Sequence, residues 1–331
     1  MPGGGILQSV EAARLALFGH AWTLRPYAIA PFQSTKPLEG ERPWSTSIVD
    51  PRRGALRLTG RLRMRDDDPS RPLAVLVHGL GGTIDSLYVV ALAHALAAVG
   101  VDTLRLHLRG ADGEAADYYH AGLDGDLAAA LASPEIEART AVGVVGFSLG
   151  GHLALRLAAS NTGPRPSAVV AVCPPLELAS GARELDRFHR RPYLRHVLSG
   201  LVAMYRAVAA RGPVPIAVDE AARIRSLYAW DERVVAPRHG FAGADDYYAK
   251  VSVARRLGSI ETPTLVVVGA DDPMIPASIV TPWLAGASRA VDARVVPGGH
   301  VGFSRSLDLG ERAPRGLDPQ LASWIARTLA T

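Results

Sequence analysis

Ser148 stands in a sequence context that could make its hydroxyl group a nucleophile. The segment Gly146-Phe147-Ser148-Leu149-Gly150 follows an apolar run and opens a stretch with helical character. Small residues two positions before and after the serine let a strand and a helix meet in a sharp turn that exposes the side chain. The pattern predicts covalent catalysis. The structural alternative is a glycine-rich turn that happens to contain serine.

A serine hydroxyl is a weak nucleophile at neutral pH, so it needs a base, and the base needs an orienting carboxylate. His300 follows the apolar run 290–296, and the acids Asp271 and Asp272 follow the run 264–268. Of the ten histidines, His300 is the one that combines this position with flanking glycines. On residue order alone, either acid could reach the imidazole ring.

An acyl-transfer site also needs N–H donors for the oxyanion that forms on the attacked carbonyl, and losing one such donor typically costs about 2.7 to 4 kcal/mol. The backbone N–H of Leu149 directly follows the serine. A second donor, the N–H of Leu80, is expected from the loop His78-Gly79-Leu80-Gly81-Gly82. The alternative for this loop is phosphate binding, but no G-x-x-x-x-G-K pattern follows it. We expect His78 to hold the loop rather than to transfer protons.

The elements that must position these residues alternate between strands and helices. Helical stretches are expected at residues 84–99, 123–132, 149–159, 276–285 and 320–329, and an antiparallel pair at 45–50 and 55–64 is expected to form one edge of the sheet. The alternation predicts an α/β fold with a mostly parallel, doubly wound sheet and helices on both faces. Buried strands are expected at residues 73–77, 101–106, 141–145, 168–172, 264–268 and 290–296.

The alternation stops between residues 174 and 255, and this length predicts a helical cap inserted over the site. Residues 1–72 would then supply an N-terminal segment and the edge strands, while 73–173 and 256–331 would form the core. Within the insertion, Leu194, Val197, Leu198, Leu201, Val202 and Tyr205 share one helix face. We expect this face to pack on the core and partly to line an acyl pocket.

The sequence resembles the YheT-like family of α/β hydrolases, which is related to the abhydrolase-domain lipid hydrolases and to fungal ethanol O-acyltransferases. The resemblance implies the α/β-hydrolase fold and a Ser148, Asp272, His300 triad, with Asp272 favoured over Asp271 because the family places its acid three residues beyond the strand-ending glycine. The matching segments are His78-Gly79-Leu80-Gly81-Gly82, Arg109-Gly110, Tyr119-His120-Ala121-Gly122, Gly146 to Gly151, Gly240-Phe241, Asp246-Tyr247-Tyr248, Asp271-Asp272-Pro273 and Gly298-Gly299-His300-Val301-Gly302-Phe303.

The resemblance implies hydrolysis of short- to medium-chain acyl esters or lipids, with no cofactor and no metal ion. One alternative is transfer of the acyl group to an alcohol, and another is a non-catalytic, ligand-binding member of the fold. Tyr118, Tyr119 and His120 are expected to brace the structure rather than to contact the substrate.

Composition excludes several other classes. The net charge of +4 comes almost entirely from arginine without any nucleic-acid recognition motif, so no nucleic-acid partner is expected. The single cysteine, Cys173, allows no internal disulfide, and with no signal-peptide pattern a cytoplasmic location is expected. No stretch in the first thirty residues is apolar enough to span a membrane, and an amphipathic helix packed on the protein is favoured there. Peripheral lipid contact stays open, although the run Arg183, Arg187, Arg190, Arg191 and Arg195 is expected to be a solvated helix face.

Overall fold

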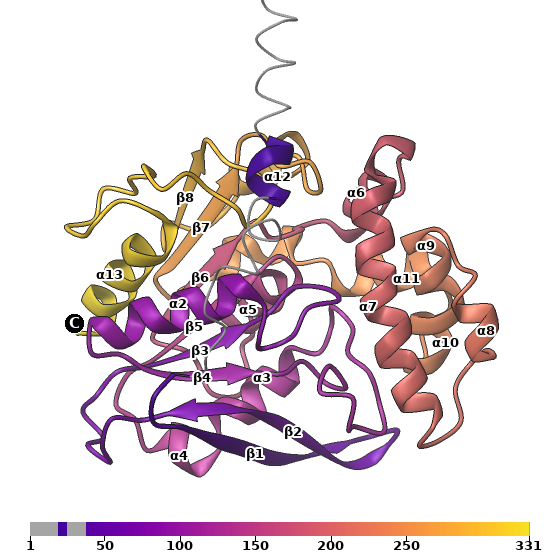
Figure 1. The fold of residues 1–331 in the computed structure, drawn as a ribbon, viewed down its shortest axis with the longest axis horizontal. Helices are drawn as coiled ribbons and strands as arrows, with labels where there is room; N and C mark the ends of the chain where they lie inside the picture. Colours follow the sequence, from indigo (N-terminus) through magenta and orange to yellow (C-terminus); the bar gives the residue numbers. More distant parts are fainter. Residues whose placement is uncertain (1–18, 25–37, 331) are drawn as a thin grey trace, which may run out of the picture.

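The computed structural model describes residues 19–24 and 38–330, and its centre is an eight-stranded sheet with the order β1-β2-β4-β3-β5-β6-β7-β8 (Figure 1). Neighbouring strands run parallel from β4 to β8, whereas β2 is antiparallel to both β1 and β4. The strands are β1 (Glu41–Asp50), β2 (Gly54–Arg63), β3 (Leu73–Val77), β4 (Asp102–Leu106), β5 (Val142–Phe147), β6 (Ala168–Val172), β7 (Thr264–Gly269) and β8 (Val291–Val296).

The central strands are buried on both faces. Along β3, Val75 and Val77 belong to one hydrophobic cluster, whereas Ala74 and Leu76 belong to the other. Because side chains of a strand alternate between faces, this division places a core on each side of the sheet. The expectation of six buried strands is wrong for β8, whose residues are exposed or half-buried because β8 is the outer strand of the sheet.

Helices cover both faces, as expected from the alternating sequence. Figure 1 shows α2 (Leu87–Ala98) and α13 (Leu317–Leu329) side by side, and both pack into one cluster. On the other face, α5 (Leu149–Ala158) contacts β5, β6 and α3 (Asp124–Leu131). The remaining helices of this part are α4 (Pro134–Glu137), η4 (Ala254–Ser259) and α12 (Ala277–Leu284).

The chain between β6 and η4 is mostly helical, and these helices gather at one side of the sheet in Figure 1. They are α6 (Leu178–Leu185), η2 (Phe188–Arg190), α7 (Arg191–Ala209), α8 (Val218–Ala221), α9 (Leu227–Trp230), the π-helical turn η3 (Asp231–Val235), α10 (Ala236–His239) and α11 (Ala244–Val251). We refer to residues 174–255 as the helical insertion. The division of the chain into core and cap stays an interpretation.

The start of the helical insertion differs in one respect from the expected solvated face of arginines. Arg190 is buried and forms an ion pair with Glu184 at 2.6 Å, because the turn η2 directs it inward. Arg183, Arg187, Arg191 and Arg195 are exposed, as expected. Within the described part of the chain, no helix has the length and hydropathy that crossing a lipid bilayer would require.

Candidate active site

Ser148 lies in a strained turn between β5 and α5. Its φ of 52° falls in the left-handed region, which costs a residue with a Cβ atom of order 1–3 kcal/mol. A methyl group at Gly146 would overlap the backbone of Gly150, and one at Gly150 would overlap the carbonyl oxygen of Val77. The glycines therefore let strand and helix approach, and the turn presents the Ser148 hydroxyl. Cys173 and Val301 are the other non-glycine residues with positive φ among those described, and both lie beside this site.

Ser148, His300 and Asp272 form a continuous hydrogen-bonded chain. The Oγ of Ser148 lies 2.9 Å from Nε2 of His300, and Nδ1 of His300 lies 2.7 Å from Oδ2 of Asp272. A carboxylate can only accept, so Nδ1 carries the proton and Nε2 is free to accept one from the serine. Both Asp272 and His300 are buried. These distances and the burial are what a nucleophile, a base and an orienting acid would require.

The two candidate acids lie in different surroundings. Oδ1 of Asp272 accepts the backbone N–H groups of Met274 at 2.8 Å and Ile275 at 2.9 Å, so the carboxylate is fixed on both oxygens. Asp271 is half-buried, and desolvation raises the pKa of its carboxyl group. Its backbone N–H donates to the carbonyl of Gly298. The structure thus brings Asp272, and not Asp271, against the imidazole ring.

Thr23 supports His300 from the far end of the sequence. Its Oγ1 accepts the backbone N–H of His300 at 2.8 Å and donates to the carbonyl of Gly19 at 2.8 Å. The sequence alone does not predict this contact, because Thr23 and His300 lie 277 positions apart and no local pattern connects them. The helical turn at 19–24 does pack on the protein, as expected for this segment, while the rest of the expected amphipathic helix lies outside the described residues.

The loop after β3 is held so that one N–H group stays unused. The N–H of Gly79 donates to the hydroxyl of Tyr88 at 3.1 Å, and that of Gly81 donates to the hydroxyl of Tyr119 at 2.7 Å. Among the described residues, no group accepts from the N–H of Leu80 between them, or from that of Leu149. Both leucines line the cavity beside Ser148. The two N–H groups are therefore available to an oxyanion.

His78 acts as a structural residue of this loop. It is fully buried, it accepts the N–H of Leu108 through Nε2 at 3.1 Å, and its Nδ1 lies 2.8 Å from the carbonyl of Gly79. Burial lowers the pKa of His78 to about 4, so the ring stays neutral and keeps this arrangement. The expected bracing role also fits Tyr118, which donates to the carbonyl of Val234, although Tyr119 and His120 line the cavity as well.

A cavity of about 720 Å³ opens onto Ser148 and lies between the sheet and the helical insertion. Its volume lies within the range of small-molecule sites, and its wall is mainly apolar. Helix α7 contributes Tyr193, Val197 and Leu201, whereas Leu194 and Leu198 pack in the hydrophobic core. The apolar face of α7 that the sequence predicts thus partly lines the cavity and partly packs in the core.

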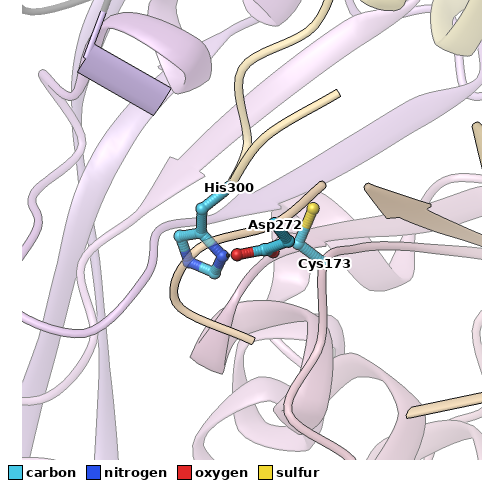
Figure 2. A group of neighbouring side chains, drawn as sticks. All are labelled: Cys173, Asp272 and His300. Atoms are coloured by element: carbon cyan, nitrogen blue, oxygen red, sulfur yellow. Dashed lines mark hydrogen bonds and ion pairs between the residues drawn. The ribbon is translucent and has the colours of Figure 1, made fainter. Parts of the chain in front are cut away.

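Figure 2 shows the three side chains in the described residues that could converge on a metal ion, Cys173, Asp272 and His300. Their ligand atoms lie within 4.8 Å of one another. Burial raises the pKa of the Cys173 thiol well above its usual value, however, and a metal ligand must be a thiolate. The sulfur instead lies 3.5 Å from the N–H of Val301 and 3.6 Å from the carbonyl of Gly299. The group fits a hydrogen-bonded site better than a metal centre.

Sequence comparisons show which known proteins this chain resembles. Residues 74–309 match the profile described as the alpha/beta hydrolase family. YheT of Escherichia coli (strain K12), an esterase by its name, is 30% identical over 267 residues, which cover 78% of each chain. Monoacylglycerol lipase of Saccharomyces cerevisiae is 22% identical, over 72% of this chain and 56% of the yeast protein. Phospholipase ABHD3 of Mus musculus is 26% identical, over 73% of this chain and 60% of that protein.

Solved structures support the same fold. The esterase Pf2001 of Pyrococcus furiosus superposes with a TM-score of 0.53 at 16% identity and covers 87% of this chain and 92% of its own. The 2,6-dihydroxy-pseudo-oxynicotine hydrolase superposes with a TM-score of 0.52 at 18% identity, covering 92% of this chain and 71% of its own. These likenesses show the fold, and the sequence matches show that the chain belongs to the α/β hydrolase family, in its YheT-like branch, and is a carboxylic ester hydrolase.

Proposed function

We propose that the protein cleaves acyl esters through an acyl-enzyme on Ser148, with His300 as general base and Asp272 as the residue that orients it. The observation that carries the proposal is the bond of 2.9 Å between Nε2 of His300 and the Ser148 hydroxyl, on a serine that a strained turn presents to a cavity. An imidazole held by a carboxylate on its far nitrogen is a competent base for this proton.

In the first half of the reaction, Oγ of Ser148 bonds to the acyl carbon and its proton passes to Nε2 of His300. The carbonyl oxygen becomes an oxyanion, for which we assign the N–H groups of Leu80 and Leu149 as donors. The intermediate then expels the alcohol, which takes the proton from His300. In the second half, water loses a proton to Nε2 of His300 as its oxygen bonds to the acyl carbon. The bond between that carbon and Oγ of Ser148 then breaks, His300 returns the proton to Oγ, and the acid is released.

The substrate class proposed is an ester with a short- to medium-chain acyl group, including lipid esters. Support comes from the apolar wall of the cavity, because apolar surface binds acyl chains by excluding water. Relatives named monoacylglycerol lipase and phospholipase point to the same class. Acyl transfer to an alcohol would use the same acyl-enzyme and differ only in the molecule that attacks it.

The test combines labelling with turnover. A phosphonate probe should modify Ser148 in the wild type, and Ser148→Ala should lower kcat/KM for p-nitrophenyl esters by about 10⁴-fold or more while the melting temperature is kept. Wild-type turnover by Ser148→Ala, or labelling at another residue, would disprove the assignment. Measuring acid and ethyl ester with water and ethanol in competition separates hydrolysis from acyl transfer.

A further inference from the structure

Asp231 is a buried acid in the wall of the cavity that the proposed reaction does not use. It lies at the end of the helical insertion's helix α9, where it opens the π-helical turn η3, and it is 7% exposed. The other acid among the described residues of the cavity wall is Asp85, whose side chain is 71% exposed and pairs with Arg105. Asp231 therefore differs from its surroundings, since a carboxyl group is rarely buried among apolar residues without a purpose in binding or structure.

The hydrogen bonds of Asp231 satisfy only one of its oxygens. The hydroxyl of Tyr248 donates to Oδ2 at 2.6 Å, and Tyr248 also lines the cavity. Among the described residues, no cationic side chain pairs with Asp231, and no group donates to Oδ1. The nearby Asp186 is occupied, since it accepts the backbone N–H groups of Leu227 and Tyr228. Since Asp231 is part of the cavity wall, Oδ1 is the atom left open to a ligand.

A purely structural role explains less of this arrangement. The bond to Tyr248 does join η3 to α11, and a brace of this kind would need one oxygen. Such a brace gives no role to the second oxygen, whereas Oδ1 is not among the fully buried atoms without a partner and is therefore accessible from the cavity whose wall Asp231 forms. The π-helical turn, a feature often found at functional sites, starts at this same residue.

The protonation state of Asp231 indicates which chemical group it can bind. Burial raises the pKa of Asp231 to about 7, so the group is not a permanent anion at neutral pH. A cationic ligand would require the charged form, whereas a hydroxyl group can hydrogen-bond to a carboxyl group in either form. A hydroxyl also suits a cavity that is otherwise apolar, because it needs only one partner there.

We propose that Asp231 binds a free hydroxyl group of the substrate, so that the enzyme selects hydroxyl-bearing esters over plain ones. The inference rests on the proposed ester hydrolysis at Ser148 and adds a specificity determinant to it. The hydroxyl has two chemical sources, the acyl chain of a hydroxy acid or the alcohol part of a partial polyol ester. Both present the same donor to Oδ1.

Two series of esters distinguish these sources. The first compares p-nitrophenyl esters of ω-hydroxy acids with those of plain acids of equal chain length. The second compares monoacylglycerols with methyl esters of the same acids. For each pair, the ratio of kcat/KM with and without hydroxyl is measured by the release of acid. The wild type should favour the hydroxyl form by about tenfold or more in one series, at the length that reaches Asp231.

Variants test whether Asp231 causes the preference for hydroxyl-bearing esters. Asp231→Leu keeps the approximate shape of the side chain and should reduce the ratio of kcat/KM with and without hydroxyl to near one. Tyr248→Phe should reduce this ratio to an intermediate value, because Oδ2 loses the donor that orients the carboxyl group. Asp85→Asn, at the exposed acid of the same cavity, should keep the wild-type ratio. An unchanged ratio in Asp231→Leu would overturn the inference.

The wild type alone keeps the inference falsifiable if the variants do not fold. Equal rates on both members of every pair would overturn it, while hydrolysis that depends on Ser148 would still support the proposed function. If Ser148→Ala retained hydrolysis, the proposed function would fail instead. The two failures are therefore distinguishable.

Discussion

Two buried acids of this enzyme, Asp272 and Asp231, have the same side chain and different sets of partners. Asp272 follows the buried strand β7 and has donors on both oxygens, two backbone N–H groups on one and His300 on the other. Asp231 lies in the helical insertion and has one donor in the part of the chain that the structure describes, the hydroxyl of Tyr248. The first is held in one orientation by the protein alone, whereas the second keeps an oxygen for a ligand.

The contrast indicates that the ends of the parallel strands and the helical insertion have different roles. The ends of the parallel strands hold the groups of the proposed reaction in fixed positions. Ser148 and Asp272 follow β5 and β7, which pair on both sides in the sheet, whereas His300 follows the edge strand β8 and is held by Asp272 and Thr23. The helical insertion supplies most of the remaining cavity wall and, with Asp231, a polar contact for selection. Changes at the first acid should therefore alter the rate for every ester, and changes at the second should alter the choice among esters.

The largest effect is expected from Asp272→Asn, which should lower kcat by about 10⁴-fold, because an amide favours the wrong imidazole tautomer. Asp271→Asn is the matched control and should retain most of the activity. Steady-state kinetics on one p-nitrophenyl ester measures both. Greater damage in Asp271→Asn would make Asp271 the orienting acid.

A pH effect on stability should distinguish the second acid. An unfolded aspartate has a pKa of about 3.9, whereas burial raises that of Asp231 to about 7. Between these values, the folded protein holds a proton that the unfolded chain has released. The contribution of this group to the free energy of unfolding therefore falls as the pH rises, by about 1.4 kcal/mol per pH unit, and stays constant above both pKa values.

Asp231→Asn removes this titration. Relative to the wild type, the variant should gain stability from pH 4 to about pH 7, by up to a few kcal/mol, as measured by urea unfolding at each pH. Parallel stability profiles of the two proteins would contradict the raised pKa and weaken the contrast between the two acids.

A smaller effect is expected from Thr23→Val, which leaves the backbone N–H of His300 without its acceptor. An unsatisfied buried donor costs about 1–3 kcal/mol, so the melting temperature should fall and kcat should decline without a change in the preferred ester. Thr23→Ser keeps the hydroxyl group and should behave like the wild type. Equal losses in both variants would show that the methyl group, not the hydrogen bond, matters.

The smallest effect concerns chain length and uses two neighbouring leucines of α7. Leu201 lines the cavity, and Leu198 packs in the core without lining it. Leu201→Trp should narrow the cavity and shift preference severalfold toward shorter p-nitrophenyl esters. Leu198→Trp should lower the melting temperature and leave the order of preference unchanged. A shift in preference from Leu198→Trp alone would place the acyl pocket elsewhere.

Local patterns in the sequence determined most of the framework. Short apolar runs separated by helical stretches predicted the strands to within a few residues, because strand and helix periodicities differ along any chain that buries one face. The glycine pattern around Ser148 indicated a turn with close backbone contact, which follows from the size of glycine alone. The antiparallel edge of β1 and β2 was likewise readable from the turn between them.

Tertiary structure decided what depends on contacts between distant positions. It selected Asp272 over Asp271 for contact with His300, placed Thr23 beneath the same histidine, and exposed β8 at the edge of the sheet. It also buried Asp231 in the cavity wall beside Tyr248. A sequence states which side chains are present, but burial and hydrogen-bond partners arise only when separate elements pack together, and these two quantities decide what a carboxyl group can do.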